Sequence, residues 1–122
     1  MGLKSALAVT LAVLCGASAA SAQQDKLDPA EEAAVRRADK IIKEHRLLTE
    51  RQQRCMSFMY RDDSDARTAK VGIYEIHDKD CGGDPEIIHR LFDLEIDMKT
   101  GAAKWDNDTP DMEMRPVPKR AR

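Results

Sequence analysis

Residues 89–98 read His-Arg-Leu-Phe-Asp-Leu-Glu-Ile-Asp-Met, and apolar and acidic side chains alternate through most of this stretch. In an extended strand, such alternation places one set of side chains on one face and the other set on the opposite face. The apolar face comprises Phe92, Leu94, Ile96 and Met98, and the acidic face comprises Asp93, Glu95 and Asp97. The pattern is typical of an antiparallel sheet that covers a core with one face and meets water with the other.

Weaker strand patterns lie on both sides of this stretch. Residues 55–60 and 70–77 also alternate before it, and residues 102–106, which include Trp105, are expected to form a short last strand after it. Residues 99–101, Lys-Thr-Gly, are typical of a tight turn between the last two strands. Because short connections favour neighbouring antiparallel strands, the sequence predicts a meander of four strands.

A helix is predicted before the strands, over residues 29–48. Apolar side chains recur there at helical spacing, while Asp28 and Pro29 are suited to the N-cap and the first helical position. The expected fold class is therefore α+β, with one N-terminal helix packed on a four-stranded antiparallel meander sheet and one disulfide.

The first 22 residues have the composition of a cleavable secretory signal peptide. A positive charge at Lys4 precedes the largely apolar residues 6–14. Residues 20–22, Ala-Ser-Ala, place small side chains where a signal peptidase probes the chain, so cleavage is expected between Ala22 and Gln23. The signal predicts export to the bacterial periplasm, with secretion from the cell as a further destination.

Removal of the signal peptide, residues 1–22, would leave three segments. They are a leader over 23–28, an α+β domain over 29–106 and a flexible basic tail over 107–122. Lipid attachment at Cys15 and an uncleaved anchor are the alternatives to cleavage.

Two cysteines, Cys55 and Cys81, remain once Cys15 has left with the signal peptide. In an oxidising compartment, such a pair in a small domain favours a disulfide. Cys55 opens the first predicted strand, and Cys81 lies just past the end of the second. A disulfide would therefore close the open end of the hairpin that these strands form. Free or intermolecular thiols are an alternative.

Residues 77–89 contain a loop rich in Asp and Gly, which we regard as a possible binding loop because loops often carry binding residues. Its candidate residues are His77, Asp78, Asp80, Gly82, Gly83, Asp84 and His89. The loop begins like a calcium loop, but His89 stands where such a loop needs a bidentate glutamate. A metal site that joins His77 and His89 to the cysteines lacks the close C-x-x-C spacing of zinc sites. No metal or cofactor is therefore expected, and a turn-rich connection is the simplest interpretation.

Composition limits the classes of partner. The chain carries 20 Lys and Arg against 22 Asp and Glu, which gives a net charge of −2. A nucleic-acid-binding domain would show a basic excess, so no nucleic-acid partner is expected. The tail ends in Lys119-Arg120-Ala121-Arg122, which would bind a membrane surface only weakly.

Residues 94–105 resemble the terminal hairpin of small PepSY-type and cystatin-like exported domains, in which a strand, an Asp, a Thr-Gly turn and a strand follow one another. The wider resemblance covers residues 29–106. The Cys-Gly-Gly-Asp-Pro loop at 81–85 resembles instead that of small uncharacterised periplasmic proteins of proteobacteria. These resemblances imply a noncatalytic binding or inhibitory module and supply no functional residues.

The sequence thus predicts a small exported protein that is noncatalytic and acts by binding or inhibition. Its expected partner is another protein or an envelope component, and its oligomeric state is left open. A secreted effector or host-directed factor is one alternative. A small hydrolytic enzyme is the other, and it would gather His77, His89 and carboxylates in a concave pocket.

Overall fold

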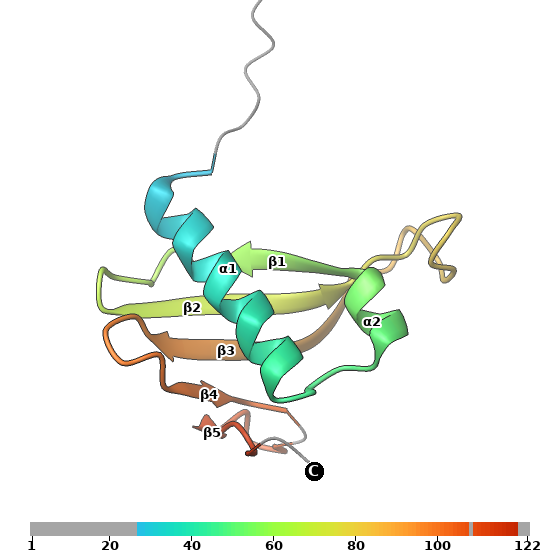
Figure 1. Ribbon diagram of the computed structural model, residues 1–122. Coiled ribbons are helices and arrows are strands. Elements are labelled where there is room, and N and C mark those ends of the chain that lie inside the picture. The colour runs from blue at the N-terminus through green and yellow to red at the C-terminus, as the bar shows by residue number, and fades with distance from the viewer. Residues whose placement is uncertain (1–26, 108, 120–122) are drawn as a thin grey trace, which may run out of the picture.

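A computed structural model describes residues 27–107 and 109–119. The described chain forms two helices, α1 (Pro29–Glu44) and α2 (Glu50–Arg54), and five strands, β1 (Met56–Tyr60), β2 (Thr68–Glu75), β3 (His89–Asp97), β4 (Ala103–Trp105) and β5 (Arg115–Pro116). All neighbouring strands are antiparallel, and their order in the sheet is β1-β2-β3-β4-β5 (Figure 1). The predicted signal peptide, its cleavage point at Ala22 and Gln23, and the last three residues of the basic tail lie outside the described residues.

The predicted α+β class and disulfide are confirmed, but two details of the predicted fold are wrong. The sheet has five strands rather than four, because Arg115 pairs with Trp105 and Pro116 with Lys104. A two-residue edge strand that contains proline shows no alternation, so these residues were predicted to belong to the flexible tail. The main helix begins at Pro29, well inside the chain, so it is N-terminal only relative to the strands.

Helix α1 begins as predicted and ends earlier. The Asp28 side chain accepts a hydrogen bond from the backbone N–H of Ala30, as an N-cap does. The helix stops at Glu44 rather than near residue 48 because Arg46 adopts a left-handed backbone with φ 51°. His45 follows the last turn, and its Nδ1 lies 2.7 Å from the carbonyl oxygen of Pro118. The C-terminal segment is thereby held against the end of the helix.

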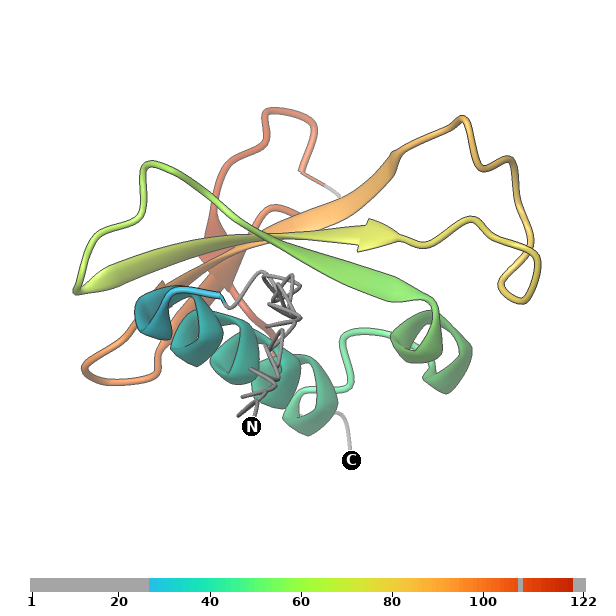
Figure 2. The ribbon, with the colours of Figure 1, turned by 90° about the horizontal axis from the view of Figure 1, so that it is seen from above.

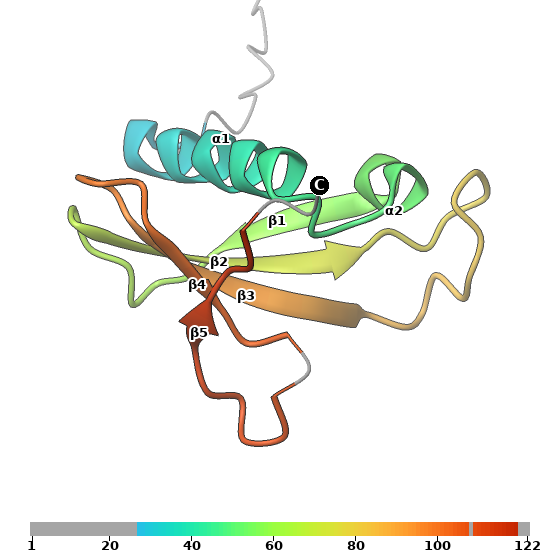
Figure 3. The same cartoon turned by 60° about the horizontal axis from the view of Figure 1, so that its bottom comes forward.

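The core lies between α1 and one face of the sheet. Figures 2 and 3 show α1 lying across that face, with the segment between β4 and β5 on the opposite side. The buried apolar residues are Ala34, Ala38, Ile41, Ile42, Ala69, Val71, Ile73, Phe92, Leu94 and Ile96. The predicted alternation of residues 89–98 is thus confirmed, since every second residue of β3 from Phe92 to Ile96 is buried.

A polar network covers part of the other face of the sheet. Arg61 donates hydrogen bonds to Tyr74 at 2.8 Å and to Asp93 at 2.9 Å. Asp106 is buried; its side chain accepts from Arg90 at 2.9 Å and from the backbone N–H of Asp93 at 2.7 Å. A buried carboxylate with these partners joins the end of β4 to the middle of β3.

We expect Asp106→Ala to lower the free energy of unfolding by about 2 kcal/mol, because it leaves the Asp93 amide without its acceptor and Arg90 with the longer, 3.5 Å ion pair to Asp93. Urea denaturation monitored by circular dichroism measures the change. Glu113→Ala is the control, since its ion pair with Arg115 is exposed and 3.7 Å long. Equal stability of the two variants would contradict the role assigned to Asp106.

Candidate functional site

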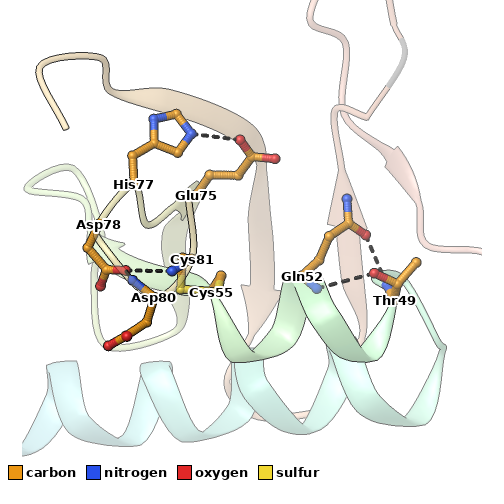
Figure 4. The surroundings of a disulfide bond; sticks show 8 residues. All are labelled: Thr49, Gln52, Cys55, Glu75, His77, Asp78, Asp80 and Cys81. Carbon is orange, nitrogen blue, oxygen red and sulfur yellow. Dashed lines mark hydrogen bonds and ion pairs between the residues drawn. A yellow bond between two sulfur atoms is a disulfide. The ribbon is translucent and has the colours of Figure 1, made fainter. Parts of the chain in front are cut away.

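The disulfide between Cys55 and Cys81 marks one end of the sheet (Figure 4). The two Cα atoms are 5.7 Å apart, and the backbone N–H of Ile76 donates to the carbonyl oxygen of Cys55 at 2.8 Å. The bridge thus lies where the β1–β2 hairpin opens, as the order of the strands predicted. It is consistent with an exported or oxidising environment.

Helix α2, which was not predicted from the sequence, leads directly into Cys55. Thr49 and Gln52 form a capping box, in which each side chain bonds the other residue's backbone N–H. Cys55 caps the C-terminal end of the helix and donates its N–H to the carbonyl oxygen of Gln52 at 3.1 Å. The T-x-x-Q spacing was the available signal, although these five helical residues bury no side chain.

The loop after β2 is built by carboxylates that bond its own backbone. Asp78 accepts hydrogen bonds from the N–H groups of Asp80 and Cys81, at 2.9 and 2.7 Å. The side chain of Asp84 accepts from the N–H of Glu86 at 3.0 Å. These two predicted binding residues therefore stabilise turns, and Asp80 is exposed.

The two glycines of the loop have different environments. Both have left-handed backbones, with φ 78° at Gly82 and 84° at Gly83. A side chain at Gly82 would meet open space, whereas a Cβ at Gly83 would lie 2.7 Å from Cδ2 of His77. Gly83 is thus required both by its backbone angle and by its contact with the imidazole ring.

Glu75, His77 and His89 form a cluster at the base of this loop. The Glu75 Oε2 atom lies 3.0 Å from His77 Nε2 and 2.8 Å from His89 Nδ1. His77 Nδ1 lies 3.1 Å from the carbonyl oxygen of Asp84 and 3.0 Å from that of Ile87. Figure 4 shows the His77 ring turned toward the Glu75 carboxylate. The imidazole is therefore held at both nitrogens.

The cluster perturbs its own proton affinities. Hydrogen bonding to His89, and then to His77, lowers the pKa of the Glu75 carboxyl. The hydrogen bond to Glu75 raises the pKa of His77, and the carbonyl oxygens of Asp84 and Ile87 add to this effect. An anionic carboxylate is thus stabilised beside the imidazole of His77.

The position of His89 depends on an irregularity in the β2–β3 pairing. Ile73 lies opposite Phe92, but Tyr74 lies opposite Arg90, so the register shifts by one residue between Ile73 and Tyr74. Glu75 therefore faces His89 rather than Arg90. Both histidines were predicted as candidate site residues and Glu75 was not, although the E-x-H spacing puts Glu75 and His77 on the same side of an extended strand.

A second feature of this end of the sheet is an open groove of about 280 Å³ on β1. Its lining residues are Ser57, Phe58, Met59, Tyr74, Glu75, Ile76, His77, Pro85, Ile87 and Ile88. Several apolar side chains beside it are exposed: Met59 by 48%, Ile87 by 56% and Ile88 by 81%. Large apolar side chains grouped in this way mark interaction surfaces more often than single ones do.

Comparison with known proteins gave no match to a family model, to a curated protein or to a solved structure. Among the residues that the structure describes, neither helix has the length and apolar character needed to cross a membrane.

Proposed function

We propose that the chain is an exported, noncatalytic binding protein of the periplasm, which takes up an extended segment of another protein along β1. The observation that carries the proposal is the combination of a free sheet edge with an exposed apolar groove beside it. Peptide-binding domains commonly use such an edge, where backbone hydrogen bonds supply affinity and neighbouring pockets supply specificity.

The edge at β1 has the properties that such binding requires. It is an outer strand of the sheet, and no described strand pairs with its far side. Residues 56–60 include neither a charged residue nor a proline, the residue types that natural proteins use to block an edge.

The backbone groups that point outward follow from the hydrogen bonds to β2. The carbonyl oxygen of Cys55 accepts from the N–H of Ile76, and the N–H of Arg61 donates to the carbonyl oxygen of Lys70. The backbone N–H and C=O groups of the odd-numbered residues from 55 to 61 therefore point toward β2. In an antiparallel pair, every second residue points its N–H and C=O groups away from the partner strand. In β1 these residues are Met56, Phe58 and Tyr60.

An extended segment fits this surface better than a second copy does. An edge of five residues is only about 17 Å long, whereas a stable dimer buries about 800 Å² on each partner. An incoming segment could use the edge and also place alternate side chains in the groove beside Met59 and Ile88.

Two observations favour the periplasm as the place of action. The Cys55–Cys81 disulfide is consistent with an oxidising compartment, where such bonds form and persist. The first 22 residues have the sequence pattern of a signal peptide.

The test is cross-linking from a photoreactive residue at position 88, followed by binding measurements with the captured protein after purification. Ile88→Asp should weaken binding about 10- to 100-fold, because it places a charge in the apolar contact. Leu27→Asp, at a position that is 47% exposed and outside the groove, should leave affinity unchanged. Equal loss in both variants would count against the groove.

Hydrogen exchange then tests the edge itself. The amides of Met56, Phe58 and Tyr60 should exchange more slowly in the complex, since they gain acceptors from the bound segment. Unchanged exchange at all three amides would rule out strand addition. If the chain instead dimerises as its concentration rises, and the same three amides are protected in the dimer, the edge binds a second copy of the chain.

A small hydrolase is the second candidate, because Glu75 brings His77 and His89 together, although the groove on β1 is lined by Glu75 and His77 and not by His89. The disulfide leaves Cys55 and Cys81 without a nucleophilic thiolate, so such a hydrolase would use the histidines and the carboxylate rather than a cysteine. Turnover of ester or peptide substrates that disappears in His77→Gln would support the enzyme. A secreted effector would instead be found in the culture medium.

A further inference from the structure

We propose that Glu75, His77 and His89 bind a zinc ion, through the Glu75 carboxylate, His77 Nε2 and His89 Nδ1. The site would lie at the base of the loop between β2 and β3. This inference goes beyond the proposed peptide binding and does not depend on it.

The neighbours of His77 fix the tautomer of its neutral ring. Its Nδ1 has two carbonyl oxygens as neighbours, at 3.1 and 3.0 Å, and carbonyl oxygens can only accept. Nδ1 therefore carries the hydrogen, and the neutral ring presents a lone pair at Nε2. That lone pair points at Glu75 Oε2, another acceptor, only 3.0 Å away. Two facing lone pairs require a cation between them, which is either a proton or a metal ion.

The same contacts are those of a metal-bound histidine. Histidine ligands usually donate their second ring N–H to a backbone carbonyl or a carboxylate, which fixes the ring and its tautomer. The carbonyl oxygens of Asp84 and Ile87 do this for His77, and Gly83 packs against the ring from its side. The imidazole is thus already oriented before an ion arrives.

The spacing of the three groups suits a small divalent ion. Their ligand atoms lie within 4.8 Å of one another. Glu75 Oε2 is 3.0 Å from His77 Nε2 and 2.8 Å from His89 Nδ1. Two ligands at about 2.1 Å from a tetrahedral zinc ion are roughly 3.4 Å apart, so the two Glu75 contacts would each lengthen by about half an ångström to admit the ion.

The donor set identifies the class of ion. Two imidazoles and one carboxylate suit zinc and its neighbours in the first transition series, whereas magnesium and calcium prefer oxygen ligands alone. Three protein ligands leave a fourth position for water or a partner's side chain. The side chain of His89 is 57% exposed, which leaves the site open to solvent.

A bound ion would join the two ends of the loop. Glu75 is the last residue of β2 and His89 is the first of β3, while His77 lies just inside the loop. An ion held by all three would restrain the connection that carries Ile87 and Ile88.

Calorimetric titration of the full, oxidised and untagged chain with zinc chloride tests the proposal. We expect one zinc ion per chain. His77→Gln, His89→Gln and Glu75→Gln should each weaken binding about 100-fold or more, since even loss of a residue that only orients a ligand costs about 10- to 100-fold. His45→Gln is the matched control and should bind zinc as the unaltered chain does. Zinc binding that survives both His77→Gln and His89→Gln would overturn the site.

A second measurement on the unaltered chain avoids any variant that fails to fold. Zinc should shift the ring nitrogen resonances of His77 and His89 in NMR spectra and leave those of His45 unchanged. The absence of saturable binding below about 1 mM zinc would refute the proposal, because affinity that weak is no more than about 4 kcal/mol. Shifts at His45 alone would refute it as well.

Discussion

Cys55→Ser combined with Cys81→Ser is expected to lower the free energy of unfolding by about 3.5 kcal/mol, the chain-entropy value for a loop of this length. The two cysteines are separated by 26 residues, and the bridge removes many of the conformations that the unfolded chain would otherwise sample. For a domain of this size the melting temperature should fall by roughly 15–25 °C. Since small domains are stable by only about 5–15 kcal/mol, the change is a large share of the total.

Thermal and urea unfolding of the oxidised chain and of the double variant measure this effect. A reductant provides the control, because it should lower the stability of the unaltered chain to that of the variant and leave the variant unchanged. The native oxidised protein should show neither Cys55 nor Cys81 as a titratable thiol. Two reactive thiols per native domain, or a loss below about 1 kcal/mol, would contradict the prediction.

Phe92→Ala is expected to destabilise the domain by about 3–5 kcal/mol, as truncation of a buried phenylalanine usually does. Phe92 is only 1% exposed and is the first buried residue on the apolar face of β3. Its ring meets that of Trp105 edge to face, with centroids 5.1 Å apart and an angle of 75° between the planes. The substitution removes this contact and leaves a cavity between the sheet and α1.

Urea denaturation of Phe92→Ala, Phe92→Leu and Met59→Ala measures how the effect depends on burial. Phe92→Leu retains most of the volume and should cost less than half as much as the alanine variant. Met59→Ala changes a side chain that is 48% exposed, so the fold should lose little stability. A small effect at Phe92, comparable with that at Met59, would show that the core does not lie where the structure places it.

The strand pattern made it possible to predict the disulfide between Cys55 and Cys81. Once residues 55–60 and 70–77 pair as a hairpin, the positions of Cys55 and Cys81 follow from the order of the strands. The strands and their pairing can both be predicted from the local sequence, because side chains in a strand alternate with a period of two and hairpins join strands that are neighbours in the chain. The acidic face of β3 was predicted equally well, but its partners were not. Asp93 binds Arg61, which is 32 residues away in the chain.

The candidate site could be predicted only in part. His77 and His89 stand out as titratable residues on either side of a loop, and the structure brings both to one carboxylate. The carboxylate belongs to Glu75 because the β2–β3 register shifts by one residue after Ile73. Such an irregularity changes which residues face each other across two strands, and the sequence shows no sign of it.

By itself, the sequence determined the class of fold, the position of the strongest strand to within one residue and the pairing of the cysteines. These depend on side-chain periodicity and on the order of elements, which are written along the chain. Only the tertiary structure decided that residues 115–116 complete the sheet, that Asp106 is buried, and that Glu75 lies between two histidines. Each of these depends on contacts between residues far apart in sequence. Strand register and packing select such contacts, and no local pattern encodes them.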